Sequence, residues 1–262
     1  MTKRSKTLLA IAGILAVEVA LALKAKPEIE IGDIPQWKFS VGGHEVTINS
    51  RTALMSWLVM AVWTGMALAV RMRLREVPGR LQAMFESVVE FFDDLISDTL
   101  GPGNRTYLPW IGSLFLFIWL SNIIGIIPGL EEPTRDLNVP IGCMLVVLTM
   151  VHASAIRKKG LKGYIKSYMQ PFALLLPLNV IGEMAKGVSL AFRLFGNIMG
   201  GAIILLVVSS LVRYVLIPVG LNLFFGLFVG TIQAFVFTML ALAYTAVAVS
   251  DCLLYTSPSP RD

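Results

Sequence analysis

Long apolar runs separated by short polar loops account for most of this chain. Residues 52–70, 107–128 and 137–156 each form an apolar stretch of about 20 residues, which is the length that a helix needs to cross a bilayer. Two further apolar runs cover residues 171–212 and 214–250. The pattern therefore predicts an all-α polytopic membrane protein with about five core membrane helices.

The last two runs are too long for an upright crossing. Straight helices over them would measure about 63 and 55 Å, whereas the hydrocarbon core is about 30 Å thick. Breaks at Pro177, Gly187 or Pro218 would shorten them, and a strong tilt would accommodate them whole. We expect two long, strongly tilted helices that form a hairpin, a shape that follows a curved partner surface.

Residues 81–100 show a different pattern. Apolar side chains recur at helical spacing on one face, and the other face carries acids: Glu86, Glu90, Asp93, Asp94 and Asp98. This predicts an amphipathic interfacial helix. Because anionic lipid headgroups repel an acidic face, that face is either solvated or turned toward a basic partner.

Both ends of the chain differ from the membrane region. Residues 1–26 combine a basic leader with a short apolar run and predict a signal-like or anchor helix. Residues 27–50 are polar and predict an extracytoplasmic segment with a small hairpin around Gly42–Gly43. We expect the membrane domain to cover 51–251. Residues 252–262 contain Ser-Pro-Ser-Pro and predict a disordered tail, either native or foreign to the protein.

Composition agrees with a membrane location. Hydrophobic residues make up 56% of the chain and charged residues 15%, against about 25% in soluble domains. The net charge is +5, and most of the Lys and Arg residues lie in short loops beside apolar runs, including the basic loops 71–80 and 157–166, which argues against nucleic-acid binding. The positive-inside rule places both loops, and the C-terminus, in the cytoplasm. The spacing of Cys143 and Cys252 indicates neither a metal site nor a disulfide framework, and the sequence predicts no cofactor.

One apolar run contains a permanently charged side chain. Within SLAFRLFGNIMGG, residues 189–201, Arg193 costs about 2.5–3.5 kcal/mol at a bilayer centre. One helical stripe collects small and polar residues: Lys186, Ser189, Arg193, Asn197 and Gly200. Arg193 therefore either pairs with a carboxylate to join helices or has a function. Glu183 is the nearest acid in sequence, but it lies about 80° off the stripe.

The motif RLFGN upstream of TIQAF resembles the a subunit of the F-type rotary ATP synthase. VPGRLQAMFESVVEFF, LFLFIWLSNIIGIIPG and DLNVPIG resemble further segments of that family, and the resemblance covers about residues 35–250. It implies a proton-translocating stator that holds two offset half-channels against a ring of c subunits, each with a buried carboxylate. It also implies b-type peripheral stalk subunits as partners. The chain has no P-loop motif for binding ATP itself.

The resemblance also assigns residues. Arg193 corresponds to the family's essential arginine, which drives a ring carboxylate to release its proton and blocks leakage. Asn197 and Gln233 match its polar companions. The other candidates belong to the proton path: Glu183 and Ser189 in the cytoplasmic half-channel, and Asn122 and Asp136 in or beside the outer one.

Some positions depart from the family. Many family members have a carboxylate or histidine nine residues after the arginine, where this chain has Ala202. Many also have a polar residue on the last helix at the position of Gly226. We expect proton uptake to use water with Asn122, Asp136 or Glu131 instead. His152 is expected to be structural.

The residues leave alternatives open. A self-contained channel or secondary transporter also suits an intramembrane arginine, although the sequence shows no internal repeat. A purely structural anchor leaves Arg193 unexplained. Protons are favoured over sodium, and a bacterial plasma (inner) membrane over a thylakoid or other organelle membrane.

Overall fold

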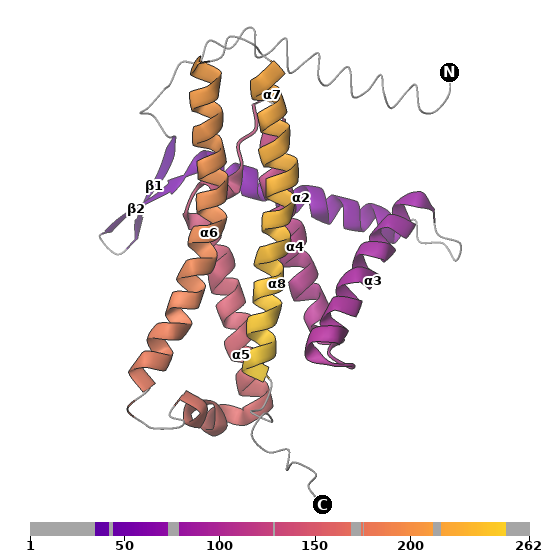
Figure 1. Ribbon diagram of the computed structural model, residues 1–262, viewed down its shortest axis with the longest axis vertical. Helices are drawn as coiled ribbons and strands as arrows, with labels where there is room; N and C mark the ends of the chain where they lie inside the picture. The colour runs from indigo at the N-terminus through magenta and orange to yellow at the C-terminus, as the bar shows by residue number, and fades with distance from the viewer. Residues whose placement is uncertain are drawn as a thin grey trace, which may run out of the picture. The chain divides into compact units, whose positions relative to one another are not determined.

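The computed structural model describes residues 35–41, 44–72, 79–127, 129–168, 174, 176–211 and 216–249 (Figure 1). The predicted helix at 1–26 and the tail at 252–262 lie outside these residues. In the described part, five helical stretches are long and apolar enough to cross a membrane: Ser50–Met72, Arg105–Ile126, Asn138–Tyr168, Leu176–Leu211 and Ile217–Val249. The prediction of an all-α polytopic membrane protein is confirmed.

A small antiparallel hairpin precedes the first membrane helix. Strand β1 (Gln36–Val41) pairs with β2 (His44–Asn49), with Gln36 opposite Asn49. Helix α2 (Ser50–Met72) follows without a linker. The Ser50 hydroxyl donates a 2.7 Å hydrogen bond to the Pro35 carbonyl, which ties the base of the hairpin to the helix start. The predicted hairpin is confirmed.

Helix α3 (Arg80–Leu100) has the predicted amphipathic form. Its apolar face is buried, with Phe92 2% exposed and the Phe92 and Phe115 ring centroids 4.9 Å apart. Most of its acids are exposed, and Asp93 binds Arg105 in the short helix η1 (Arg105–Tyr107). The basic partner of this one acid is therefore in the same chain.

The second and third crossings are joined by a loop with two short helical turns. Helix α4 (Leu108–Ile123) continues into η2 (Ile124–Ile126), and η3 (Pro133–Arg135) precedes α5 (Asn138–Tyr168). Helix α5 extends beyond the predicted end at residue 156, because helical residues continue after a kink at Gly160 as far as Tyr168. Gly160 has φ 70° and ψ 161°, a backbone conformation that is essentially restricted to glycine.

None of the three suggested break sites interrupts a helix. Helix α6 (Leu176–Leu211) runs as one element of 36 residues through Gly187, and Pro177 is its second residue. Pro218 lies in the first turn of α7 (Leu216–Leu223), where a missing N–H costs little. At 36 residues, α6 is about 54 Å long, so its strong tilt stays a prediction.

The final crossing contains a feature that its apolar pattern does not indicate. Between α7 and α8 (Gly230–Val249), residues Phe224–Val229 form the π-helical stretch η5. A π-helical stretch adds backbone per turn and therefore shifts which side chains share a face.

The chain divides into two compact units. The hairpin unit contains, among the described residues, 35–62, Ile118–Asp136 and Phe195–Ala234. The α5 unit contains Trp63–Phe117, Leu137–Leu194 and Phe235–249. Helices α2, α4, α6 and α8 contribute residues to both.

Candidate functional site

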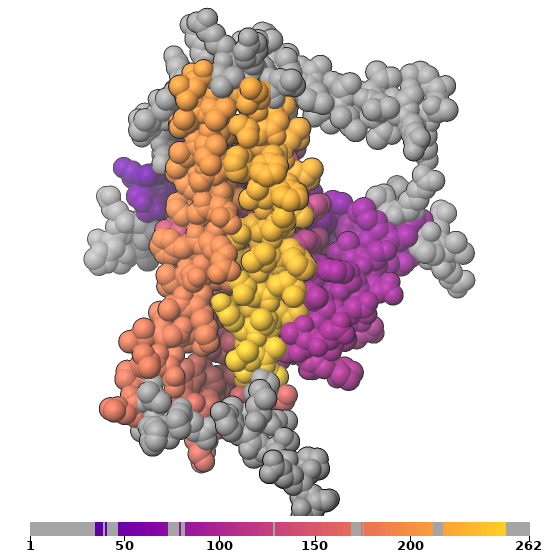
Figure 2. All heavy atoms as spheres, viewed as in Figure 1, coloured from indigo at the N-terminus to yellow at the C-terminus, as the bar shows by residue number. Residues whose placement is uncertain are grey.

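Arg193 lies on the exposed side of α6. The opposite side is packed, with Leu190 2%, Leu194 0% and Ile198 8% exposed. Figure 2 shows α6, in orange, at the surface of the molecule. No ion pair or hydrogen bond engages Arg193 among the residues that the structure describes. The nearest acid, Glu183, instead pairs with Lys186 at 3.1 Å, which argues against a structural Arg193–Glu183 pair.

Asn197 and Gln233, the two predicted companions, are brought together in the hairpin unit. The Asn197 Nδ2 donates a 2.5 Å hydrogen bond to the Gln233 Oε1 and joins α6 to α8. Gln233 is 3% exposed, and its Nε2 has no partner among the described residues. The amide pair is therefore fixed in place while retaining one donor.

A cavity of about 370 Å³ opens beside this pair, and we name it the Asn122 cavity. Asn122 and Asn197 line it, together with Glu131, Glu132 and Ala202. Asp136 is not part of its lining. The carboxylate of Asp136 accepts a 3.0 Å hydrogen bond from the Thr52 hydroxyl instead.

Both polar groups of the Asn122 side chain make a hydrogen bond. Its Nδ2 donates to the Gly230 carbonyl at 2.9 Å, and its Oδ1 accepts from the Thr134 hydroxyl at 2.8 Å. Asn122 and Thr134 are both 0% exposed. Asn122 therefore links α4, α8 and η3, and its amide is committed to positioning the walls of the cavity.

The two departures from the family also line this cavity. Ala202 and Gly226 stand on α6 and η5, respectively. A Cβ atom at Gly226 would lie 2.5 Å from Cγ1 of Ile126. Ile126 thus fills the space that a larger residue at 226 needs, which gives a steric reason for the glycine.

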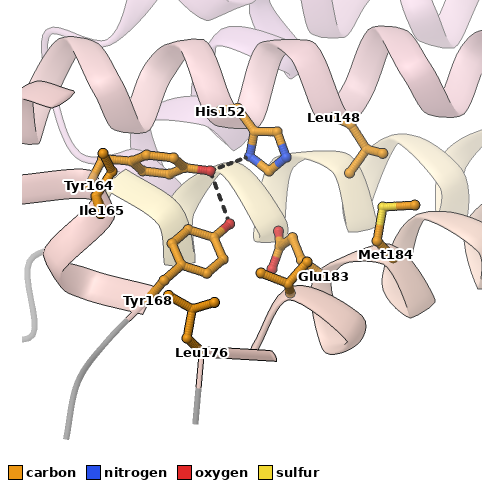
Figure 3. Close-up of a pocket in the computed structure, with 9 residues that line it drawn as sticks. Leu148, His152, Tyr164, Ile165, Tyr168, Leu176, Glu183 and Met184 are labelled. Carbon is orange, nitrogen blue, oxygen red and sulfur yellow. Dashed lines mark hydrogen bonds between the residues drawn. The ribbon is translucent and has the colours of Figure 1, made fainter. Parts of the chain in front are cut away.

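The α5 unit contains two neighbouring cavities of about 320 and 510 Å³, which we name the His152 cavities. Four side chains line both: His152, Tyr164, Tyr168 and Glu183. The Tyr164 hydroxyl shares a 3.1 Å hydrogen bond with Nδ1 of His152 and donates a 3.0 Å one to the Tyr168 hydroxyl. Figure 3 shows these rings converging with Glu183 on one space.

The larger His152 cavity extends toward α8. It is also lined by Lys186, which lies 5.8 Å from the ring centroid of Tyr244, and by Asn179, which donates to the Tyr168 carbonyl at 2.9 Å. Ser189 is exposed and lines neither cavity. Of the two residues predicted for this path, Glu183 lines the His152 cavities and Ser189 does not.

Sequence reasoning missed the tyrosines around Glu183. Tyr164 and Tyr168 are four residues apart, a spacing that places two side chains on one helical face and was available as a signal. Nothing in the sequence links them to His152, because the Gly160 kink brings the end of α5 back toward it. Within the described ranges, no cluster of His, Cys, Asp and Glu side chains is arranged to hold a metal ion.

Comparison with known proteins shows which family this chain matches. The family described as ATP synthase A chain matches residues 53–246. ATP synthase subunit a 1 of Syntrophotalea carbinolica is 42% identical over 200 residues, covering 75% of this chain and 84% of that protein. ATP synthase subunit a of Moorella thermoacetica is 39% identical, covering 74% and 88%.

A further relative differs in its named ion. The ATP synthase subunit a of Propionigenium modestum, described as sodium ion specific, is 36% identical over 226 residues, covering 80% of this chain and 77% of that protein. The family match and these relatives establish that the chain belongs to the ATP synthase A chain family, whose members are ion-translocating membrane subunits of the ATP synthase complex.

Proposed function

We propose that this subunit conducts protons through two half-channels, with Arg193 between their inner ends. The observation that carries the proposal is the distribution of cavities along α6. Residues 176–186 of α6 contribute to the His152 cavities, and residues 197–209 contribute to the Asn122 cavity. Arg193 lies in the intervening stretch, which lines neither.

The charge of the loops supports a direction for this path. The basic residues 157–166 accompany the Tyr164 end of α5, so the positive-inside rule puts the His152 cavities on the cytoplasmic side. The family resemblance assigns Asn122, which lines the other cavity, to the outer path, and the C-terminus is proposed to be cytoplasmic. A bacterial plasma membrane fits this orientation.

An unpaired arginine suits the chemistry of proton release. A guanidinium within a few ångströms of a carboxylate lowers its pKa by about 1–3 units, so a protonated ring carboxylate arriving there gives up its proton. Arginine stays protonated at any working pH and cannot pass protons itself. It therefore also blocks a direct leak between the half-channels. Each charge crossing 100 mV releases about 2.3 kcal/mol, which becomes available for rotation.

The exposed side of α6 supports a protein partner. The apolar side chain of Phe192, next to Arg193, is 54% exposed, and the polar Ser189 one turn earlier is exposed as well. Lipid alone does not explain the polar part of this face, whereas a ring of c subunits with buried carboxylates does. The b-type stalk subunits are proposed from family membership alone.

The proposed ion is the proton, and sodium is the alternative raised by the Propionigenium modestum relative. ATP-driven transport that continues in sodium-free buffer supports protons. A strict requirement for sodium in the medium contradicts them.

The decisive experiment replaces Arg193 by Ala in the assembled ATP synthase in sealed vesicles. ATP synthesis driven by a proton gradient and passive proton leak are measured on the same preparation. We expect synthesis to be lost while the leak is unchanged or increased. Arg157→Ala, at an exposed arginine of α5, is the matched control and should leave synthesis unchanged. Unchanged synthesis in Arg193→Ala would make Arg193 a structural residue.

A further inference from the structure

Three acids occupy the loop between α4 and α5, and the fold gives them different partners. Glu131 Oε1 pairs with the Arg51 guanidinium at 3.0 Å, and both side chains are at least half exposed. Asp136 accepts from Thr52, outside the lining of the Asn122 cavity. Glu132 lines the cavity, and no ion pair engages its carboxylate among the described residues.

The Glu132 side chain reaches the cavity across a glycine. A Cβ atom at Gly125, in η2, would lie 2.0 Å from Oε1 and 2.2 Å from Cδ of Glu132. The carboxylate therefore occupies space that any other residue at 125 would take. The glycine therefore leaves room for the acid, and a Cβ atom at 125 would displace the carboxylate.

Two hydrogen bonds hold the backbone next to Glu132. Glu132 directly precedes η3, and its carbonyl accepts a 3.1 Å hydrogen bond from the Arg135 N–H. Thr134, in η3, is anchored to Asn122 as described above. The segment that carries the acid is thus attached to α4 and, through Asn122, to α8.

The surroundings of Glu132 suit a group that binds and releases protons. Burial raises the pKa of its carboxyl above the usual range, Glu131 raises it further, and the backbone and Arg135 oppose the shift. A carboxyl whose pKa is raised toward the working pH transfers protons more effectively than an ordinary one. Asn197, Asn222 and Ser209 supply polar partners for water in the same cavity.

We propose that Glu132 is the proton-carrying acid of the Asn122 cavity and does the work of the carboxylate or histidine that is absent at Ala202. The carboxylate takes a proton from hydronium in the cavity, which becomes water, and later returns that proton to cavity water on the ring side. Both Glu132 and Ala202 line this cavity. The cavity therefore has an acid, but the acid comes from the loop before η3 and not from position 202 of α6. The proposal rests on the proposed function.

The test measures ATP-driven proton pumping by the assembled ATP synthase in sealed vesicles. Glu132→Gln keeps the shape of the side chain but replaces the carboxyl with an amide that cannot bind and release protons. We expect pumping to fall by about 100-fold, the lower end of what a positioned proton-transfer group contributes. Glu90→Gln, at an exposed acid of α3, is the control for the same chemical change and should pump normally. The amount of subunit in the membrane is determined alongside to detect failed assembly.

Moving the acid within the cavity provides a second, independent readout. The double variant Glu132→Gln/Ala202→Glu should recover pumping, since it restores a carboxylate to the same space. Gly125→Ala, which retains Glu132 but displaces its carboxylate, should reproduce the defect of Glu132→Gln. Glu132→Asp, one methylene shorter, should retain partial activity.

The outcomes separate this proposal from the proposed function. Normal pumping by Glu132→Gln, with Arg193→Ala inactive, overturns the role of Glu132 alone. Normal synthesis by Arg193→Ala overturns the proposed function itself. Failure of Ala202→Glu to restore pumping in an assembled Glu132→Gln complex also counts against a proton-carrying role.

Discussion

Adjacent acids in one loop show how surroundings decide the behaviour of a residue. Glu131 is exposed and paired with Arg51, whereas Glu132 is half-buried against Gly125. Because burial raises the pKa of Glu132, its protonated form is favoured by folding. Its contribution to stability is therefore fully present below the pKa of an unfolded glutamate, about 4.3, and is lost as pH rises through the higher folded value.

The direction of this pKa shift gives a prediction for the stability of the variant Glu132→Gln. The melting temperature of the variant subunit in lipid nanodiscs should match wild type near pH 4 and exceed it near pH 8, because the variant has no buried carboxylate to charge. Glu90→Gln in α3 measures the effect of removing a surface acid. A wild-type protein that gains stability over Glu132→Gln as pH rises would contradict the assignment.

The Asn197–Gln233 bond allows a second prediction at this scale. The bond is partly buried, and interhelical hydrogen bonds in membrane proteins average about 0.6 kcal/mol. A double-mutant cycle of Asn197→Leu, Gln233→Leu and the double variant, followed by denaturation in mixed micelles, should give a coupling of about that size. Strict additivity would show that the amide contact contributes nothing to stability.

At the level of elements, α5 depends on one glycine for its shape. The kink at Gly160 separates a long membrane helix from a short terminal segment. That segment presents Tyr164 to His152 and Tyr168 to Tyr164, and so forms a wall of the His152 cavities. The expectation that His152 is structural remains a prediction, because its bond to Tyr164 is compatible with either role.

Gly160→Ala tests this arrangement. The backbone conformation at position 160 should lower the free energy of unfolding of the alanine variant by about 1–3 kcal/mol, because alanine has a Cβ atom. The segment that carries Tyr164 should also shift. Gly163→Ala is a matched control three residues away, where the new Cβ meets only Lys159 Cβ at 3.4 Å. We expect the control to be neutral or more stable by about 0.5–1 kcal/mol. Equal melting temperatures for the two variants would contradict the strained-kink account.

For the whole molecule, membership in the ATP synthase A chain family leads to one prediction. If the subunit completes its path only against a ring of c subunits, the purified chain in liposomes should conduct no more protons than empty liposomes. A self-contained channel or secondary transporter would conduct on its own. A pH-sensitive dye inside the liposomes, with an ionophore as the positive control, distinguishes the two.

Several features of the whole molecule were predictable because they follow from local pattern. Apolar runs of sufficient length force helices in a bilayer, where every backbone N–H and C=O must be bonded internally. Helical spacing likewise placed Arg193 opposite the packed side of α6, where Leu194 is 0% exposed. The amphipathic α3 and the β1–β2 hairpin also follow from the period of their side chains.

Periodicity and motifs were enough to predict the all-α membrane class, the number of crossings, the stripe that carries Arg193 and, through RLFGN and TIQAF, the family. Which polar residues meet depends on how the helices and loops fold together. The tertiary structure joined Asn197 to Gln233, engaged Asn122 with Thr134 and Gly230, placed Asp136 beside Thr52, and brought Glu132 into the cavity lined by Ala202. The physical reason is that periodicity fixes the face of one helix, whereas these contacts join segments far apart in sequence through kinks, short turns and glycine-sized gaps.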